Sequence, residues 1–170
     1  MSVETGDIRH GRRALEPDEI RRLLEATATQ PMRYGLTGRE RILLYRLAVE
    51  TGLRRNELRS LKVLSFDFEG CTVTVEAQHT KNGKLAVLPL RVNTAAELRQ
   101  FVAGKPPNTQ VFKVPGATAK MFRIDLKAAG IDYVDESGRY TDFPLTATHH
   151  RDAIGCCRCS PENGADPYAT

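Results

Sequence analysis

The amino-acid sequence predicts an α+β fold that is mainly α, with a small antiparallel β-sheet or hairpin. Apolar residues recur at helical spacing in three stretches, residues 17–28, 38–50 and 118–129. Another segment favours strand, because β-branched residues fill 72–75 and an Asn-Gly pair marks a turn before 85–90. A chain of 170 residues can bury a core of its own, so we expect one domain.

The first two helices follow from their start signals. Pro17 stands in the first turn of a helix that is expected to reach Ala28, with carboxylates favoured by the helix dipole. Thr37 is expected to cap a second helix over residues 38–50. In that helix the arginines are expected to face solvent, and the core-facing residues to be Ile42, Leu43, Leu47 and Ala48.

A tight turn between two helices follows. Gly52 suits a helix end, and a new short helix is expected after it. Leu58 and Leu61 are spaced to anchor the new helix to the core, which would fix Arg54 and Glu57 near the junction.

A hairpin and two more helices complete the predicted domain. Strands are expected over 71–76 and 85–90, with Lys81 and Lys84 beside the turn between them. Asn93 is expected to cap the next helix. The helix over 118–129 should end at Gly130, and residues 131–143 read as irregular and polar.

Charge and composition narrow the functional classes. The formal net charge of +4 and the isoelectric point near 9.0 suit a polyanionic partner, although many other proteins share them. No apolar run is long enough to span a membrane and no signal peptide begins at Met1, so a cytoplasmic protein without a membrane partner is expected. The four cysteines do not form a disulfide framework.

Two motifs carry a resemblance to a known family. Residues 51–58 read T-G-L-R-R-N-E-L, and residues 80–84 and 87–90 read T-K-N-G-K and V-L-P-L. Together with their spacing, they resemble the catalytic domain of the tyrosine recombinases, the phage integrase family. The resemblance runs from about Arg13 to Phe143 and implies the N-terminal part of that domain.

The resemblance implies a reaction and roles for named residues. In the family a tyrosine attacks the scissile phosphate, forms a 3′-phosphotyrosyl link and releases a 5′ hydroxyl, without ATP, metal or other cofactor. Arg54 would be the first of two clamping arginines, and Lys81 would protonate the leaving oxygen. Glu57 would orient an arginine. Arg54 and Lys81 could instead be solvated surface charges, and Lys84 lies close enough to Lys81 to exchange roles with it.

Further implications concern partners. The intact family acts on DNA as a homotetrameric synaptic complex. Arg55, Arg59 and Lys84 are candidate DNA contacts, and a solvated helix face is an equal alternative for the two arginines.

From Pro144 onward the sequence departs from the family. In the family an Asp-Phe pair is followed by an H-x-L-R-H box, which supplies a histidine and the second arginine. Here Asp142-Phe143 is followed by P-L-T-A-T-H, and apolar periodicity is lost through residue 170. The family's N-terminal core-binding domain is also not recognised in the chain.

The genetic code suggests a reason for the departure. Residues 144–168, back-translated with free synonymous choices and read one base later, allow H-S-L-R-H-T-T-A-T-L-L-A-A-A-G-V-H-P-K-T-A-Q-T-L-M. That string contains the missing box and an Ala/Leu-rich helix. We infer a single-base frameshift near codon 143, caused by mutation or by a sequencing error.

The tail offers tempting residues that are better explained as products of a shifted frame. Tyr168 lies in a Gly/Asp/Pro-rich context without the helices that should precede a nucleophile. A zinc site is disfavoured because adjacent cysteines are a poor tetrahedral clamp. Its ligands would be His149, His150, Cys156, Cys157 and Cys159. The other tyrosines precede the position of the family nucleophile, and Tyr45 is expected in the core.

The prediction is therefore a leader over residues 1–12 that is disordered, a partial catalytic domain over 13–143 and a non-native tail over 144–170. Two functions remain. The chain belongs by descent to site-specific DNA recombination and integration, or it is only a weak, non-catalytic DNA-binding remnant. A third outcome is an unstable product, since lost helices would expose apolar faces of 42–49 and 118–129. No strand cleavage by this chain is expected.

Overall fold

The computed structural model describes residues 11–80, 82–141 and 143. The predicted fold class is confirmed: helices dominate, and a small antiparallel sheet accompanies them. The helices are α1 (Pro17–Ala28), α2 (Gly38–Thr51), α3 (Arg55–Ser60), α4 (Val92–Val102) and α5 (Thr118–Ala128), with 3₁₀ turns η1 (Val63–Ser65) and η2 (Ala77–His79). The strands are β1 (Arg12–Arg13), β2 (Phe66–Asp67), β3 (Thr72–Val75), β4 (Ala86–Pro89) and β5 (Tyr140–Thr141).

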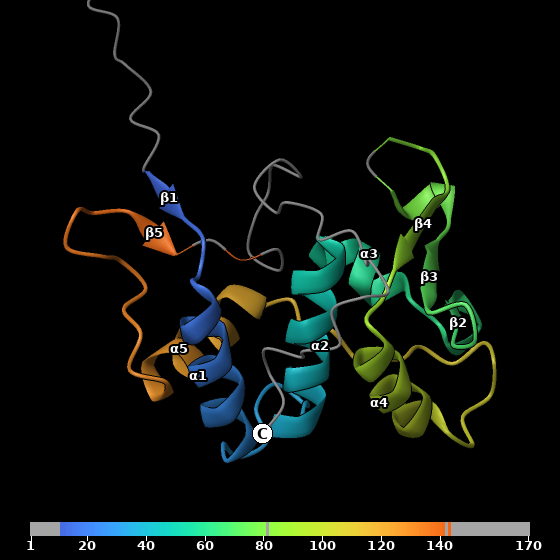
Figure 1. The fold of residues 1–170 in the computed structure, drawn as a ribbon, viewed down its shortest axis with the longest axis horizontal. Helices are drawn as coiled ribbons and strands as arrows, with labels where there is room; N and C mark the ends of the chain where they lie inside the picture. The colour runs from blue at the N-terminus through green and yellow to red at the C-terminus, as the bar shows by residue number, and fades with distance from the viewer. Residues whose placement is uncertain (1–10, 81, 142, 144–170) are drawn as a thin grey trace, which may run out of the picture.

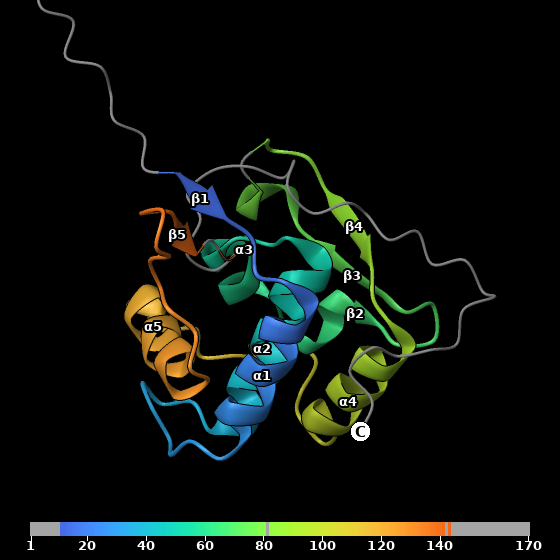
Figure 2. The same ribbon diagram turned by 60° about the vertical axis from the view of Figure 1, so that its left-hand side comes forward.

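Helix α2 is the central element, and its ends form as predicted. The Thr37 hydroxyl accepts a hydrogen bond from the Glu40 N–H at 3.2 Å, and the Glu40 carboxylate accepts one from the Thr37 N–H at 2.7 Å. At the other end Gly52 adopts φ 65°, a left-handed conformation that glycine takes without strain. Helices α1 and α5 pack on one side of α2, whereas α4 and the three-stranded sheet lie on the other (Figures 1 and 2).

The prediction that all arginines of α2 face solvent is wrong for Arg41, whose side chain is fully buried. Its guanidinium donates to Asp125 of α5 at 2.9 Å and 3.3 Å, and to the carbonyls of Pro31 and Leu36. The Tyr45 hydroxyl donates to the same carboxylate at 2.7 Å. Burial and the Asp125 carboxylate raise the pKa of Tyr45 above its ordinary value. A buried ion pair thus joins α2, α5 and the loop before α2.

The predicted hairpin is part of a three-stranded sheet with strand order β2-β3-β4. Strands β3 and β4 pair antiparallel, with Val73 opposite Leu88 and Val75 opposite Ala86. The connection between them is longer than a two-residue Asn-Gly turn, because the chain first forms η2 and then turns at Gly83, where φ is 60°. Val73 and Val75 are buried, so one face of the sheet closes the core.

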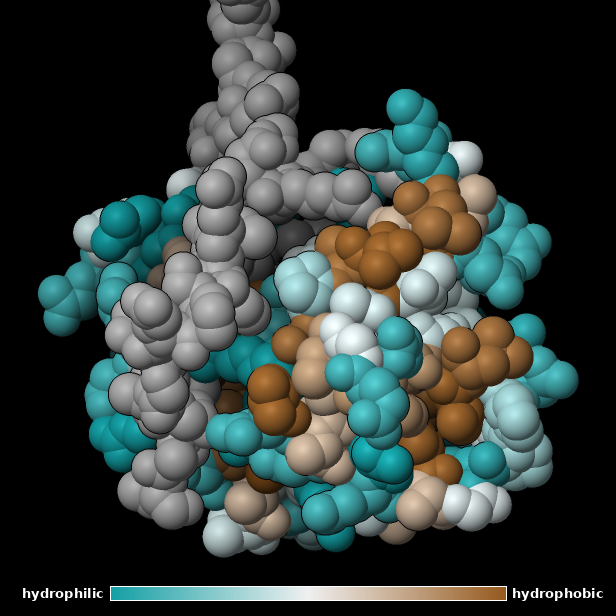
Figure 3. All heavy atoms as spheres, turned by 45° about the vertical axis from the view of Figure 1, so that its right-hand side comes forward, coloured by the Kyte–Doolittle hydropathy of each residue, from teal (hydrophilic) through white to brown (hydrophobic). Residues whose placement is uncertain are grey.

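The other face of the hairpin is apolar and open. Leu85 and Val87 are 63% and 55% exposed, and Figure 3 shows apolar surface on the side of the molecule that carries the sheet. None of the helices among the described residues is long and apolar enough to span a membrane.

Helix α4 begins differently from the prediction. Its N-cap is Arg91 rather than Asn93. Glu50 of α2 accepts hydrogen bonds from the Arg91 N–H at 3.2 Å and from the Thr94 hydroxyl at 2.6 Å. A carboxylate from a distant helix therefore replaces the local cap. Burial raises the pKa of Glu50, although these two hydrogen bonds oppose the shift.

The last described segment contains a strand that the sequence did not suggest. Strand β5 pairs in parallel with β1, with Arg12 opposite Tyr140 and Arg13 opposite Thr141. Residues 1–10 of the predicted leader lie outside the described part, and Arg12 already belongs to β1. Helix α5 ends one residue earlier than predicted, before Gly130 at φ 66°.

Candidate functional site

Arg54 lies at the junction of two helices whose backbone is held on both sides. Gly52 donates its N–H to the Ala48 carbonyl at 2.9 Å, and Leu53 beside it is buried. Arg54 is the N-cap of α3, and its N–H donates to the Glu57 carboxylate at 2.8 Å. Glu57 and Leu58 are buried, at 2% and 0% exposure. The half-buried Arg54 side chain therefore starts from a fixed base, and Glu57 supports it through the backbone.

Helix α3 presents positive charge without a matching carboxylate. Among the described residues, no carboxylate oxygen lies within 4.0 Å of the Arg54, Arg55 or Arg59 guanidinium. The Arg55 guanidinium donates instead to the Gly116 carbonyl at 2.8 Å. Elsewhere ion-paired arginines are common: Arg13, Arg21, Arg22, Arg41, Arg46, Arg99 and Arg139. The α3 surface is thus suited to an anionic partner.

The hairpin loop lies next to this surface. Lys81 itself is outside the described residues. Thr80 and Lys84 flank it: the Thr80 hydroxyl donates to the Lys84 carbonyl at 2.7 Å and accepts from the Lys84 N–H at 3.1 Å. The Lys84 side chain is exposed. The structure therefore closes the loop at its base and leaves one of its two lysines open to solvent.

Helix α3 and turn η2 of the hairpin are in contact, and they enclose an open hollow of about 450 Å³. We name it the α3 hollow; it is lined by Asn56, Arg59, Ser60, Gln78, His79 and Gln110. Of the predicted residues that the structure describes, Arg59 alone lines it. The others were missed because they come from three separate segments. The sequence contained one local signal for the hollow. Asn56, Arg59 and Ser60 have i, i+3, i+4 spacing, which places them on one face of α3.

The described tyrosines do not provide an evident nucleophile. Tyr45 is fully buried, which confirms its predicted place in the core. Tyr133 and Tyr140 pack against each other with ring centroids 5.5 Å apart, and Tyr34 lies in the loop before α2 at φ 51°. Tyr168 lies outside the described residues. The histidines and cysteines between His149 and Cys159, for which no zinc site was predicted, also lie outside them.

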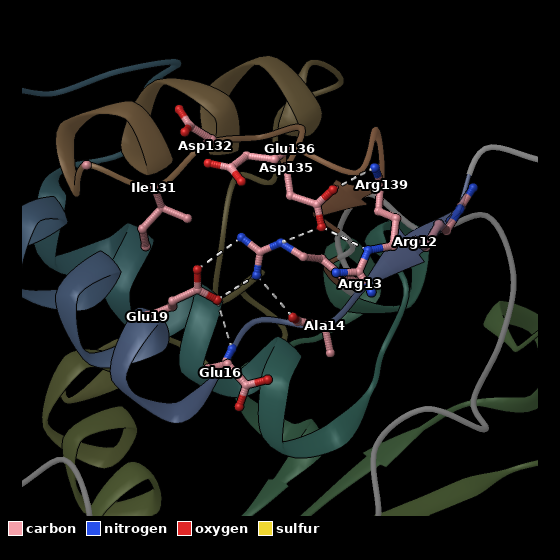
Figure 4. Close-up of a pocket in the computed structure, with 11 residues that line it drawn as sticks. Arg12, Arg13, Ala14, Glu16, Glu19, Ile131, Asp132, Asp135, Glu136 and Arg139 are labelled. Carbon is pink, nitrogen blue, oxygen red and sulfur yellow. Dashed lines mark hydrogen bonds and ion pairs between the residues drawn. The ribbon is translucent and has the colours of Figure 1, made fainter.

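A second hollow, of about 640 Å³, lies between β1, the start of α1 and the segment after α5 (Figure 4). Arg13 occupies its centre and donates to Glu19 at 2.7 Å and 3.0 Å. The Arg13 hydrogen bond lowers the pKa of Glu19, although partial burial opposes this shift. Because Glu19 and the Ala14 carbonyl already occupy its guanidinium, Arg13 is a structural link rather than a ligand contact.

Both hollows contain polar groups, yet the described residues include no cluster of three or more histidine, cysteine, aspartate or glutamate side chains suited to a metal ion.

Strand β1, helix α3 and the hairpin loop lie at the same end of the molecule, around the C-terminal end of α2 (Figure 1).

Comparison with known proteins places this arrangement in a family. The tyrosine recombinase XerA of Saccharolobus solfataricus is 34% identical over 106 residues, which cover 61% of this chain and 35% of XerA. A crystal structure of XerA recombinase superposes with a TM-score of 0.58 at 20% identity, covering 84% of this chain and 49% of that one. A λ integrase dimer bound to a COC′ core site superposes with a TM-score of 0.53 at 18% identity, covering 85% of this chain and 50% of the integrase chain.

The chain spans only part of these relatives: 27% and 35% of the lengths of two curated relatives, and about half of the two solved chains. The sequence model described as the Phage integrase family matches residues 13–144, well over half of the chain. The chain therefore belongs to the phage integrase family.

Proposed function

We propose that residues 13–143 are the first part of the catalytic domain of a site-specific DNA recombinase. The observation that carries the proposal is the position of Arg54. It stands on a buried, hydrogen-bonded helix junction, has no carboxylate partner among the described residues, and lies beside the hairpin that contains Lys81. The λ integrase dimer of similar fold is bound to a core site, which supports DNA as the partner.

The geometry suits the first half of a phosphoryl-transfer site. A planar guanidinium can donate to two nonbridging phosphate oxygens and stays charged at any physiological pH. Such a donor stabilises the phosphorane as a tyrosine oxygen bonds to phosphorus and the bond to the 5′ oxygen breaks. Lys81 would give its proton to that 5′ oxygen. Glu57 would hold Arg54 in place through the backbone hydrogen bond.

We further propose that residues 144–170 are a reading of the wrong frame, so that the chain as written binds DNA without cleaving it. The match to the family model ends at residue 144, where the H-x-L-R-H box should begin, and this supports the proposal. The intact protein would act in the cytoplasm as a homotetrameric complex on DNA, and it would need no cofactor.

The 170-residue chain is expected to bind duplex DNA of unrelated sequences with similar affinity, because phosphate contacts carry no sequence information. Affinity should fall steeply with salt. Arg54→Ala is expected to weaken binding about five-fold, measured by fluorescence anisotropy at low salt. Arg99→Ala is the matched control, since it removes an equal charge from α4, where Arg99 forms an exposed ion pair with Glu69 of the β2–β3 turn.

Two outcomes would contradict the proposal. One is equal affinity of the Arg54→Ala and Arg99→Ala proteins for DNA, which would show that only the loss of one positive charge weakens binding. The other is a covalent adduct between the unaltered chain and a nicked suicide substrate, which would show that the chain cleaves DNA as written.

A further inference from the structure

We propose that the α3 hollow is a second DNA contact, which holds a backbone phosphate of the strand beside the scissile position and takes no part in the chemistry. The inference rests on the proposed function, since it needs DNA to lie across α3. It assigns roles to Asn56, Gln78, His79 and Gln110, in addition to Arg59.

The floor of the hollow is the exposed face of α3. Asn56 and Arg59 are exposed, while Glu57 and Leu58 between them point into the core. This alternation follows from the helical period and fixes the direction of the exposed side chains. Arg54 is the N-cap of the same helix, so a DNA strand bound at the Arg54 guanidinium would lie close to this face.

Two rigid walls border the floor. Turn η2 supplies Gln78 and His79 and contacts α3 directly. The segment that carries Gln110 is held to the end of α3, because the Val111 N–H donates to the Leu61 carbonyl and the Val63 N–H to the Thr109 carbonyl, both at 3.0 Å. Since the η2 wall contacts α3 and the Gln110 segment is hydrogen-bonded to the end of α3, the hollow exists before any ligand binds.

The lining consists mainly of groups that can donate hydrogen bonds to a phosphate. Among the described residues it contains one guanidinium, three side-chain amides and one imidazole, and no carboxylate. Its one hydroxyl, that of Ser60, already donates to the Glu57 carbonyl at 2.7 Å. Glu76 is the acidic residue nearest in sequence to the η2 wall. It accepts from the Gln78 amide at 2.6 Å and lies 4.0 Å from the His79 ring, so it orients that wall without lining the hollow.

The shape favours the DNA backbone over the base edges. Side chains that read bases must project into a groove of the duplex, whereas a hollow receives a ridge. The phosphate backbone is the ridge of a duplex, and contacts to it set the position of a protein on DNA without reading sequence. Arg59 would supply the charge, and the amides would complete the hydrogen bonds.

The test compares exposed substitutions in the full chain by fluorescence anisotropy on two duplexes of unrelated sequence. Arg59→Ala is expected to weaken binding about five-fold and to lower the slope of log affinity against log salt by about one. Gln110→Ala, which changes no charge, should weaken binding about two-fold. Both losses should be equal on the two duplexes. Arg99→Ala is the control for charge, and circular dichroism confirms that each variant is folded.

Three results would overturn the inference, and they separate it from the proposed function. If Arg54→Ala weakens binding while Arg59→Ala and Gln110→Ala match the control, the hollow does not contact DNA and the proposed function stands. If the losses depend on sequence, the hollow reads bases rather than phosphates. If the unaltered chain binds neither duplex, both proposals fail.

Discussion

Removing the first base of codon 144 is expected to give a protein that links covalently to DNA, whereas the chain as written is expected not to do so. The corrected frame would encode the H-S-L-R-H box directly after Phe143, and thus the second arginine that the reaction requires. The prediction requires a tyrosine nucleophile in the corrected reading before its stop codon. The adduct is detected as a band of reduced mobility when a nicked suicide substrate and the protein are separated under denaturing conditions.

The corrected protein also tests Arg54. Its replacement by alanine should lower the rate of adduct formation by roughly 100- to 1,000-fold, the usual effect of losing one donor to a transition-state oxyanion. Arg99→Ala in the same background should leave the rate unchanged, because Arg99 lies on α4 and its ion pair with Glu69 of the β2–β3 turn is exposed. Equal rates for both variants would exclude a role of Arg54 in the reaction.

Asp125→Ala is expected to destabilise the fold by about 3–5 kcal/mol. The change leaves the buried Arg41 guanidinium without its carboxylate and removes the acceptor of the Tyr45 hydroxyl. An uncompensated buried charge costs far more than the pair contributes, since both ions have already lost their hydration. The free energy of unfolding is measured by urea denaturation monitored by circular dichroism.

A matched control separates burial from simple charge loss. Glu69→Ala breaks the ion pair with Arg99, in which both side chains are largely exposed, and should cost less than about 1 kcal/mol. Replacing Arg41 by methionine and Asp125 by leucine together should recover most of the loss, because no buried charge remains. A loss below about 1 kcal/mol for Asp125→Ala would show that the pair does not stabilise the fold.

The sequence was sufficient for elements whose signals are local. Thr37 and Gly52 mark the two ends of α2, and the alternation of Val73 and Val75 marks the buried face of β3. These features depend on residues within one or two turns of each other, so the linear pattern contains the whole cause.

Features that join distant segments were missed for the opposite reason. Asp125 neutralises Arg41 from 84 positions away, which is why a charged residue on α2 could be buried. Glu50 caps α4 from another helix, so the local candidate Asn93 was not needed. Strand β5 pairs with β1, which lies at the other end of the described chain.

The candidate site divides in the same way. Arg54 and Glu57 could be singled out because their motif is contiguous, and the structure adds the hydrogen bond between them. The α3 hollow could not, since Gln78 and Gln110 reach α3 only after the chain has folded.

The proposed frameshift is tested most directly by the bases of the gene itself, read again from fresh genomic DNA across codons 140 to 170. The shifted reading encodes the two histidines and the arginine of the box only if the third bases of the Pro144, Ala147 and Thr148 codons are A, G and A. We expect these three bases. The shifted frame is then also expected to resemble the family beyond residue 168. The gene, or its recorded sequence, would contain one extra base. Other bases at these three positions would contradict the account, and residues 144–170 would be a genuine tail.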